Sequence, residues 1–302
     1  MFRLAHLSDL HATPPRFPWG RELTAKRALG FLSWRLRRRK EHRARVLGAL
    51  LDDLAAVSPD HVAITGDLTN LGLLHEIDAA LPWLERVGGA GRVSLVPGNH
   101  DAYGPGARDA ALARWSDYVR SSGAAAGSVS FDDFPTVRVD GRIALVGVSS
   151  AERTAFGLAT GRAGPAQLAK LEETLEKLSV AGLCRVVLIH HPPLAGLSPR
   201  RALVDAPELR GVLARAGAEL VLHGHLHRRS VEAIPGPAGP IPVIGVPSSS
   251  ALGRKPGRRA QYHVYAIDTP GADSGRPHPV SIEVRGLDPV SGRFVAEGAV
   301  EI

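Results

Sequence analysis

The chain has little cysteine and few aromatic residues: one cysteine, Cys184, and 5% aromatics in 302 positions. A single cysteine excludes an intramolecular disulfide framework and any metal site built from several thiolates. Cys184 lies beside an apolar run that predicts a buried strand, so we expect it to be a packing residue. The chain also lacks an apolar run long enough to cross a bilayer and an N-terminal signal pattern. We therefore expect a cytoplasmic protein, with peripheral attachment to the inner membrane surface as a second expectation.

Apolar, turn-forming and basic residues are what the sequence does contain. A hydrophobic fraction of 44% is enough to bury a sizeable core, and 33 Gly with 23 Pro indicate aliphatic strands joined by many turns. The net charge of +7 and the pI near 10.0 favour anionic partners. Phosphate esters, nucleic acid and an acidic membrane surface all meet that description, and charge does not choose among them.

Five apolar runs along the chain end in clusters of histidine, carboxylate and amide side chains. These clusters are SDLH at 8–11, TGD at 65–67, GNHD at 98–101, HHP at 190–192 and HGHLH at 223–227. Each apolar run predicts a buried strand that ends in a polar loop. In open α/β sheets, ligands bind outside the carboxyl ends of the strands, so we expect the clusters to converge.

The order of these clusters carries more information than any one of them. Asp-x-His, Gly-Asp, Gly-Asn-His-Asp, His-x-Pro and Gly-His-x-His follow one another between Asp9 and His227. The ordered set resembles the calcineurin-like metallophosphoesterase superfamily. The resemblance implies an α/β fold, a four-layer αββα sandwich in which two mixed β-sheets pack face to face with helices outside. It also implies a metal-dependent phosphoric ester hydrolase with a dinuclear metal centre.

The resemblance assigns a ligand role to seven residues. The implied ligands are Asp9, His11 and His227 for the first metal, Asn99, His190 and His225 for the second, and Asp67 as the bridge. Carboxylate, amide and imidazole groups suit Mn, Fe and Zn, and we favour Mn for the two divalent ions. A pair of such ions acidifies a bound water into hydroxide and neutralises charge on the attacked group.

The resemblance also separates catalytic from supporting side chains. His100 matches the family's non-ligand histidine, which contacts the phosphate and protonates the leaving oxygen, a role that suits the near-neutral pKa of imidazole. We expect Asp101 to orient His100 through a hydrogen bond. The ligand lies two residues before the proline of the fourth motif, which selects His190. His191 is therefore expected to support the ligands without binding metal, and His223 to be a buried, hydrogen-bonded neighbour.

The segment at about 13–45 departs most from the family pattern. After a Pro-rich start it predicts a helix over 23–45, with three leucines at i, i+3 and i+7 and basic residues around them. The candidates for lipid or anion contact are Leu32, Trp34, Arg35 and Arg38. One interpretation is a helix packed over a sheet with a solvated basic face. The other is contact with a membrane surface or a lipid substrate, and contact with nucleic acid is less favoured.

Further elements follow from periodicity. Helices are predicted at 46–56, 107–120 and 166–179. Beyond the last histidine motif, short strands are predicted at 231–234, 241–246, 261–267, 280–284 and 294–296. We expect this β-rich part, about 228–302, to form a second sheet. Because the motifs span so much of the chain, we interpret residues 1–302 as a single domain.

The sequence thus predicts a hydrolase that cleaves a phosphodiester or pyrophosphate bond by attack of metal-bound hydroxide. A small phosphate ester is the expected substrate. The basic, aromatic insert favours, as an alternative, a lipid-linked pyrophosphate such as UDP-diacylglucosamine at the membrane surface. A nuclease is a further alternative. A binding scaffold that has lost its chemistry is disfavoured, because all seven ligand positions and His100 are present.

Overall fold

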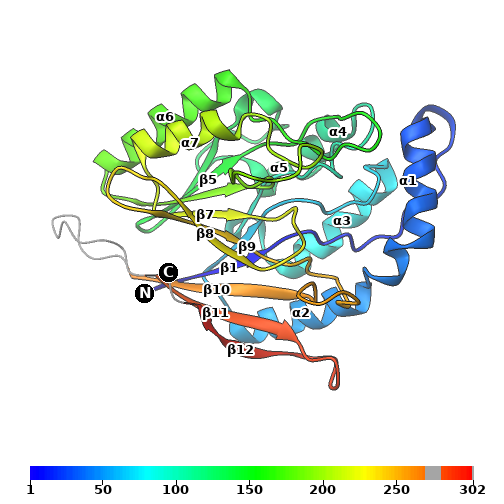
Figure 1. Ribbon diagram of the computed structural model, residues 1–302. Coiled ribbons are helices and arrows are strands. Elements are labelled where there is room, and N and C mark those ends of the chain that lie inside the picture. The colour runs from blue at the N-terminus through cyan, green and yellow to red at the C-terminus, as the bar shows by residue number, and fades with distance from the viewer. Residues whose placement is uncertain (269–279, 301–302) are drawn as a thin grey trace.

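The computed structural model describes residues 1–268 and 280–300 (Figure 1). Two mixed β-sheets of six strands each form an α/β sandwich with the helices, which confirms the expected fold class. The order is β12-β11-β10-β1-β2-β3 in the first sheet and β4-β5-β6-β7-β9-β8 in the second.

The bounds of the elements are as follows. The first sheet contains β1 (Phe2–Leu7), β2 (His61–Ile64), β3 (Val93–Leu95), β10 (Gln261–Ile267), β11 (Val280–Leu287) and β12 (Phe294–Val300). The second contains β4 (Thr136–Asp140), β5 (Ile143–Val148), β6 (Cys184–Ile189), β7 (Leu220–His223), β8 (Ser230–Ile234) and β9 (Ile241–Gly245). The α-helices are α1 (Ala25–Leu36), α2 (Ala44–Val57), α3 (Leu74–Val87), α4 (Ala107–Arg114), α5 (Ser116–Val119), α6 (Pro165–Val180) and α7 (Ala206–Ala216). Short 3-10 turns are η1 (Gly20–Glu22), η2 (Arg38–Lys40), η3 (Ala90–Arg92) and η4 (Phe131–Asp133).

The direction of the strands determines where the polar clusters lie. In the first sheet β1, β2 and β3 are parallel neighbours, and in the second β5, β6, β7 and β9 are. The carboxyl ends of parallel strands lie at the same edge of a sheet, so the loops that follow these strands begin there. The loops after β1, β2, β3, β6 and β7 therefore leave their sheets at the end of the molecule that faces α1 in Figure 1.

The core consists of two layers, and β6 shows how one strand serves both. Val186 and Leu188 pack in the cluster shared with the first sheet, whereas Val187 and Ile189 pack with α6 and α7. Successive side chains of a strand point to opposite faces, so a strand covered on both faces is apolar at every position. Cys184 is buried in the first of these clusters, which confirms its role as a packing residue.

The expectation that residues 228–302 form a sheet of their own is wrong. β8 and β9 extend the second sheet beside β7, whereas β10 pairs antiparallel with β1 and carries β11 and β12 with it. The strands formed earlier in the chain leave unpaired N–H and C=O groups at their edges, and the later strands satisfy them. The C-terminal part thus completes both sheets.

The single helix predicted over 23–45 is also wrong. α1 ends at Leu36, and α2 begins at Ala44. Between them the chain pairs with the loop after β9: the Arg43 amide donates to the Ser250 carbonyl at 2.9 Å, and the Leu252 amide to the Glu41 carbonyl at 3.0 Å. These long-range hydrogen bonds override the local preference for helix. The helix predicted over 107–120 is likewise divided, into α4 and α5.

α1 lies apart from both sheets, so the interpretation of a helix packed over a sheet is wrong (Figure 1). Its buried side is small: Arg27 Nε donates to the Leu71 carbonyl at 3.1 Å, and a Cβ at Gly30 would lie 2.6 Å from the Tyr103 hydroxyl. The leucines predicted to pack inward point outward instead. Leu29, Leu32 and Leu36 are 45%, 51% and 62% exposed. Among the described helices, none has the length and apolar composition to span a bilayer.

Candidate metal centre

The loops that follow β1, β2 and β7 bring a first group of ligand atoms together. Oxygen and nitrogen atoms of Asp9, His11, Asp67 and His227 all lie within 4.8 Å of one another. His227 Nε2 is 3.0 Å from Asp9 Oδ1, and His11 Nε2 is 3.9 Å from that same oxygen and from Asp67 Oδ2. This is the set that the resemblance assigns to the first metal and the bridge.

A second group adjoins the first through Asp67. His190 Nε2 lies 3.3 Å from Asp67 Oδ2 and 3.1 Å from Asn99 Oδ1, and His225 Nδ1 lies 3.0 Å from Asn99 Oδ1. The loops after β3 and β6 contribute Asn99 and His190. Asp67 Oδ2 thus faces the imidazoles of both groups, which is the position that a bridging carboxylate requires.

Backbone carbonyls fix the tautomers of three of these histidines. The His11 Nδ1–H donates to the Thr69 carbonyl at 2.7 Å, and the His190 Nδ1–H to the Thr65 carbonyl at 2.6 Å. His225 donates from Nε2 to the Arg201 carbonyl at 2.9 Å. Because a carbonyl only accepts, the bonded nitrogen of each ring carries a proton, and the other nitrogen, which faces the cluster, is the atom that would bind a metal.

The donor set fits divalent metal ions. Asp9 uses one oxygen, Oδ2, to accept from the Ser8 hydroxyl at 2.7 Å and the His225 amide at 3.0 Å. Its other oxygen and His11 Nε2 are buried and accept no hydrogen bond from the part of the chain that the structure describes. Buried polar atoms are normally paired, so two orphaned lone pairs in one cluster indicate a site for cations.

The charges in the cluster support the same conclusion. Burial alone would raise the pKa of Asp67, but the neighbouring His190 and His100 hold it well below its ordinary value. Burial likewise opposes the charge on His190, yet Asp67 raises the pKa of that imidazole. The negative charge of Asp67 therefore favours a positive charge beside His190 Nε2, and a cation bound there would supply it.

The backbone at the ligands has a conformation that is uncommon outside glycine. Asp9, His11, Asp67, His225 and His227 have φ angles between 41° and 65°. Such left-handed backbone turns each loop sharply, and it persists where the surrounding structure holds it. The last histidine motif also packs closely against Asp9: a Cβ at Gly224 would overlap the Ser8 hydroxyl and lie 2.6 Å from Asp9 Oδ2.

His100 lies beside the cluster, but Asp101 does not orient it. His100 Nδ1 donates to the Asn70 carbonyl at 2.5 Å, and Arg38 Nη1 donates to His100 Nε2 at 3.0 Å. Burial, followed by the charge of Arg38, lowers the pKa of His100 well below its ordinary value. The expected Asp101–His100 contact is replaced by hydrogen bonds to the backbone. Asp101 accepts from the amides of Gly98, Asp67 and Thr69 at 2.9 to 3.0 Å.

Those amides belong to the loops that follow β2 and β3, so hydrogen bonds to the Asp101 side chain link the two loops. Isolated N–H groups in a buried loop need acceptors, and the oxygens of this one carboxyl group satisfy three of them, although burial and the neighbouring Asp67 raise its pKa to about 7. Asp101 thereby positions Asp67 and Asn99, not the imidazole next to it in the sequence.

His191 and His223 both use their two nitrogens on the protein. His191 Nδ1 bonds to the Ser150 hydroxyl at 2.8 Å and Nε2 to the Ala159 carbonyl at 3.3 Å. His223 Nδ1 bonds to the Gly224 carbonyl at 2.9 Å and Nε2 to the Ser230 hydroxyl at 3.2 Å. Both rings thus use their nitrogens on the protein, although one nitrogen of His191 lies within 4.8 Å of one each from His190 and His225.

A pocket of about 410 Å³ opens over the metal cluster, and its wall is strongly basic. The lining includes Asp67, Asn99, His100, His225 and His227 together with six basic side chains, Arg37, Arg38, Arg201, Arg254, Lys255 and Arg258. The only other acidic residue of this lining is Glu41, whose Oε1 accepts the Gly253 amide at 2.8 Å. Arg35 and Trp34, also predicted for lipid or anion contact, do not line the pocket.

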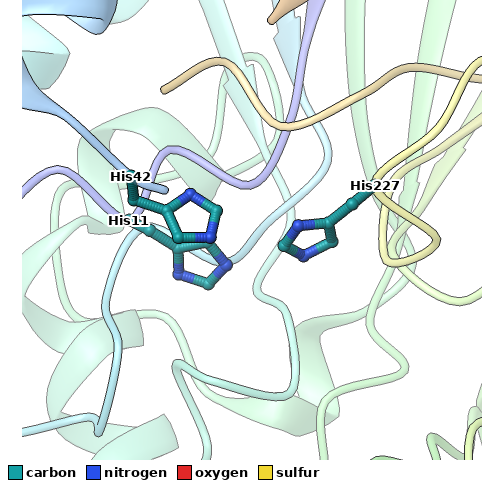
Figure 2. A group of neighbouring side chains, drawn as sticks. All are labelled: His11, His42 and His227. Atoms are coloured by element: carbon teal, nitrogen blue, oxygen red, sulfur yellow. The ribbon is translucent and has the colours of Figure 1, made fainter. Parts of the chain in front are cut away.

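His42 is a member of the site that the sequence did not reveal. Figure 2 shows its ring beside that of His11, with His227 facing both from the opposite side. The ring centroids of His42 and His11 are 4.7 Å apart, and those of His42 and His227 are 5.5 Å apart. No motif marks His42, since its place depends on pairing with a loop more than 200 residues away.

Comparisons with known proteins agree with the geometry. A family model of the calcineurin-like phosphoesterases matches residues 2–229. A dimetal phosphatase from Danio rerio is similar in structure, with a TM-score of 0.61 and 12% identity over 98% of both chains. The purple acid phosphatase PPD1 from yellow lupin and the 5'-nucleotidase precursor from Thermus thermophilus have TM-scores of 0.52 and 0.50 at 12% and 15% identity.

Those two alignments cover 98% and 97% of this chain but 52% and 55% of the lupin and Thermus chains. At such identities the likeness shows the fold alone. No curated protein sequence matches the chain. The family model, by contrast, spans well over half of the chain and contains all seven ligand positions. The chain therefore belongs to the calcineurin-like phosphoesterase family, whose members are metal-dependent phosphoester hydrolases with a dinuclear centre.

Proposed function

We propose that the protein hydrolyses a phosphodiester or pyrophosphate bond in a substrate that carries more than one negative charge. The observation that supports this proposal most strongly is the basic wall of the pocket over the metal cluster. One phosphodiester anion needs few positive groups once two cations are bound. Six basic side chains around one pocket favour a substrate with further phosphate groups.

In this proposal the chain holds two divalent ions, with Mn favoured over Fe and Zn. Asp9, His11 and His227 bind the first, Asn99, His190 and His225 the second, and Asp67 bridges them. The bound ions supply Lewis acidity that activates water and neutralises charge on the attacked group. The carbonyls that hold the imidazole tautomers keep those lone pairs directed at the ions.

Arg38 and His100 act on the substrate beside the metals. The Arg38 guanidinium has five N–H donors, and one Nη1 contact to His100 leaves others for phosphate oxygens. Burial and, after it, the charge of Arg38 keep His100 neutral, and a phosphate between the two residues would offset that charge. His100 would then take up a proton from solvent at Nε2, in place of the bond from Arg38, and give that proton to the leaving oxygen, the role that its match to the family's non-ligand histidine implies.

A substrate panel at one Mn²⁺ concentration tests this function. The panel contains a phosphomonoester, a cyclic nucleotide, a glycerophosphodiester, a nucleotide-sugar lipid and single-stranded DNA. We expect kcat/KM to be highest for a diester or pyrophosphate and Arg38→Ala to raise KM. Arg39→Ala is the matched control, because Arg39 is the exposed next residue and lies outside the pocket. Fastest turnover of the monoester contradicts the proposal, and fastest turnover of DNA favours a nuclease.

The exposed face of α1 favours one narrower candidate, a lipid-linked pyrophosphate such as UDP-diacylglucosamine at a membrane surface. Leu29, Leu32 and Leu36 form an apolar stripe that is about half exposed. The stripe ends one residue before Arg37 and Arg38, which line the pocket. Acyl chains on the stripe would place the attached phosphates at those arginines, with the protein attached peripherally to the membrane.

A further inference from the structure

His42 comes from the segment between α1 and α2, and the loop after β9 holds it in place. The Arg43 amide donates to the Ser250 carbonyl at 2.9 Å, and His42 forms an isolated antiparallel bridge with Ala251. The side chain is held as well: His42 Nδ1 lies 3.1 Å from the Ser248 hydroxyl and 3.0 Å from the Ser250 hydroxyl. The imidazole is thus fixed through both its backbone and its Nδ1 atom.

The hydrogen bonds of Ser248 favour one tautomer of His42. A serine hydroxyl has one proton, and that of Ser248 is donated to the Asp9 carbonyl at 2.6 Å. In the bond to His42, Ser248 Oγ can therefore only accept, which requires the ring proton on Nδ1; Ser250 Oγ, 3.0 Å from Nδ1, can accept that proton as well. The lone pair then lies on Nε2, which is the same arrangement that the Thr69 carbonyl imposes on His11.

The His42 ring itself lies at the first metal group. One ligand atom each from His11, His42 and His227 lie within 4.8 Å of one another. Two nitrogens bound to one ion at about 2.1 Å are at most about 4.2 Å apart, so a small adjustment suffices for a common ion. His191 and His223 show the contrast, because hydrogen bonds to the protein use both of their nitrogens.

We infer that His42 Nε2 is an additional ligand of the first metal, beyond the seven positions that the family motifs supply. The insert thereby takes part in the metal centre itself, in addition to lining its pocket. Ser248 serves two ligands at once, since it bonds to the backbone of Asp9 and to the ring of His42. Binding of the first metal is accordingly coupled to the order of the segment between α1 and α2. The inference rests on the proposed dinuclear site but not on any particular substrate.

Two substitutions separate ligation from structural support. His42→Asn places an amide nitrogen near the position of Nδ1, which keeps the bond to the serines and removes the atom at Nε2. His42→Gln places an oxygen or nitrogen near Nε2. Neither residue is large, and the ring is only partly buried, so both variants should fold; circular dichroism melting of the metal-free proteins checks this.

The measurement is metal binding without substrate. Each protein is titrated with Co²⁺ in a chelator-buffered series, and bound metal per chain is counted while the visible Co²⁺ spectrum is recorded, because that spectrum depends on the ligands and their geometry. We expect His42→Asn to weaken one of two sites roughly 10- to 100-fold and to change its spectrum. His42→Gln should recover part of the affinity, and the other site should be unchanged.

The outcomes are distinct. Two sites of wild-type affinity and spectrum in His42→Asn would overturn the ligand role of His42 and leave the dinuclear site intact. Equal losses at both sites, or equal losses in the Asn and Gln variants, would also overturn it, because they indicate a general structural effect. A wild-type protein that binds no Co²⁺ would overturn the proposed metal centre as well.

Discussion

Five of the proposed metal ligands have a left-handed backbone that most side chains avoid, with φ from 41° at His11 to 65° at His225. Among the described residues one other non-glycine residue shares it, Ser58 at the end of α2. A left-handed residue costs roughly 1 to 2 kcal/mol. At Ser58 the left-handed conformation ends a helix. At the ligands it turns the loops so that their side chains point toward one site.

The position of Asp67 between the two ligand groups leads to the first prediction. Asp67→Ala should lower the occupancy of both metal sites, because Oδ2 faces His11 on one side and His190 on the other. Asn99→Ala should mainly weaken the second site, since Asn99 Oδ1 contacts only His190 and His225 of the proposed ligands. Metal counting on dialysed proteins measures both effects. Two ions retained at full occupancy in Asp67→Ala would refute the bridge.

The second prediction concerns His100. His100→Ala should keep both metals and lose rate by roughly 10² to 10⁴, the range typical of positioned acid catalysis. The loss should be smaller for a p-nitrophenyl ester than for an alkyl ester, because a better leaving group needs less protonation. Steady-state kinetics on a matched pair of esters measures this. Equal losses on both esters would assign His100 to charge stabilisation beside Arg38, not to proton donation.

Individual residues were predictable to the extent that a motif marked them. Each proposed ligand of the motifs lies within a few residues after an apolar run, so its place in the loop after a strand could be predicted from the chain. The role of Asp101 could not be predicted, because its partners Asp67 and Thr69 are 34 and 32 residues away. His42 was hidden for the same reason. Its partner Ser250 is 208 positions away, and pairing at that distance leaves no local pattern.

At the scale of elements, β2 has a buried histidine at its first position. His61 Nε2 bonds to the Ser94 hydroxyl of β3 at 2.9 Å, and the side chain is almost fully buried. Burial, together with Arg138 and Arg92, lowers the pKa of His61 to about 4. Half-exposed Asp140, 3.9 Å from Nδ1, does not offset these effects. The imidazole is therefore neutral in the folded strand at neutral pH.

The third prediction follows from this lowered pKa. The unfolded chain binds a proton near pH 6.5, whereas the folded chain resists it until about pH 4, so stability from the neutral ring is complete above pH 6.5 and decreases as the pH falls. Between pH 7 and pH 5 the free energy of unfolding should fall by about 2 kcal/mol through His61 alone. Urea unfolding at both pH values measures the loss.

His61→Gln provides the control. Glutamine does not titrate and its amide reaches toward Ser94, so the variant should lose about 2 kcal/mol less than the wild type between pH 7 and pH 5. Both proteins carry the same metal ligands, and any acid release of metal cancels in the comparison. Identical losses in the two proteins would show that protonation of His61 does not oppose folding.

Elements covered on both faces were the most predictable, because every position of β6 is buried and its apolar run is unbroken after Arg185. The insert was the least predictable. Its leucines have helical spacing, and spacing alone does not distinguish a stripe that faces the core from one that faces solvent. After α1 the chain forms hydrogen bonds between 41–43 and 250–252. This pairing could not be predicted from residues 23–45 alone.

At the scale of the whole molecule, the basic residues that line the pocket and the exposed apolar stripe lie at the same end. The stripe is on α1, and the basic pocket is at the carboxyl ends of the central strands that α1 faces (Figure 1). Net charge alone would attract lipid headgroups and nucleic acid alike. The apolar stripe distinguishes a membrane from nucleic acid as the partner. Burial of the stripe in a membrane is favourable, whereas a nucleic acid backbone offers no apolar surface to bury it.

The last prediction uses this difference. Leu32 and Leu36 are more than half exposed, so Leu32→Ser with Leu36→Ser removes apolar surface without leaving a cavity in the core. Burial of these side chains in a headgroup region is worth about 1 kcal/mol each, so the double variant should bind anionic vesicles roughly 30-fold more weakly. Turnover of a small soluble diester should be unchanged. Val180→Ala, at an exposed position on α6, is the matched control and should bind like the wild type.

Salt then separates the charge from the apolar contribution. Each basic residue close to an anionic surface contributes about 1 kcal/mol, and this part weakens as ionic strength rises. Binding that survives in the double variant should therefore disappear at high salt, whereas binding of the wild type should persist in part. If the wild type ignores anionic vesicles at low salt, or if vesicle binding is the same in the double variant, α1 does not contact lipid. The exposed leucines would then leave the narrower lipid-linked substrate without support, while the diester or pyrophosphate chemistry at the metal cluster would be unaffected.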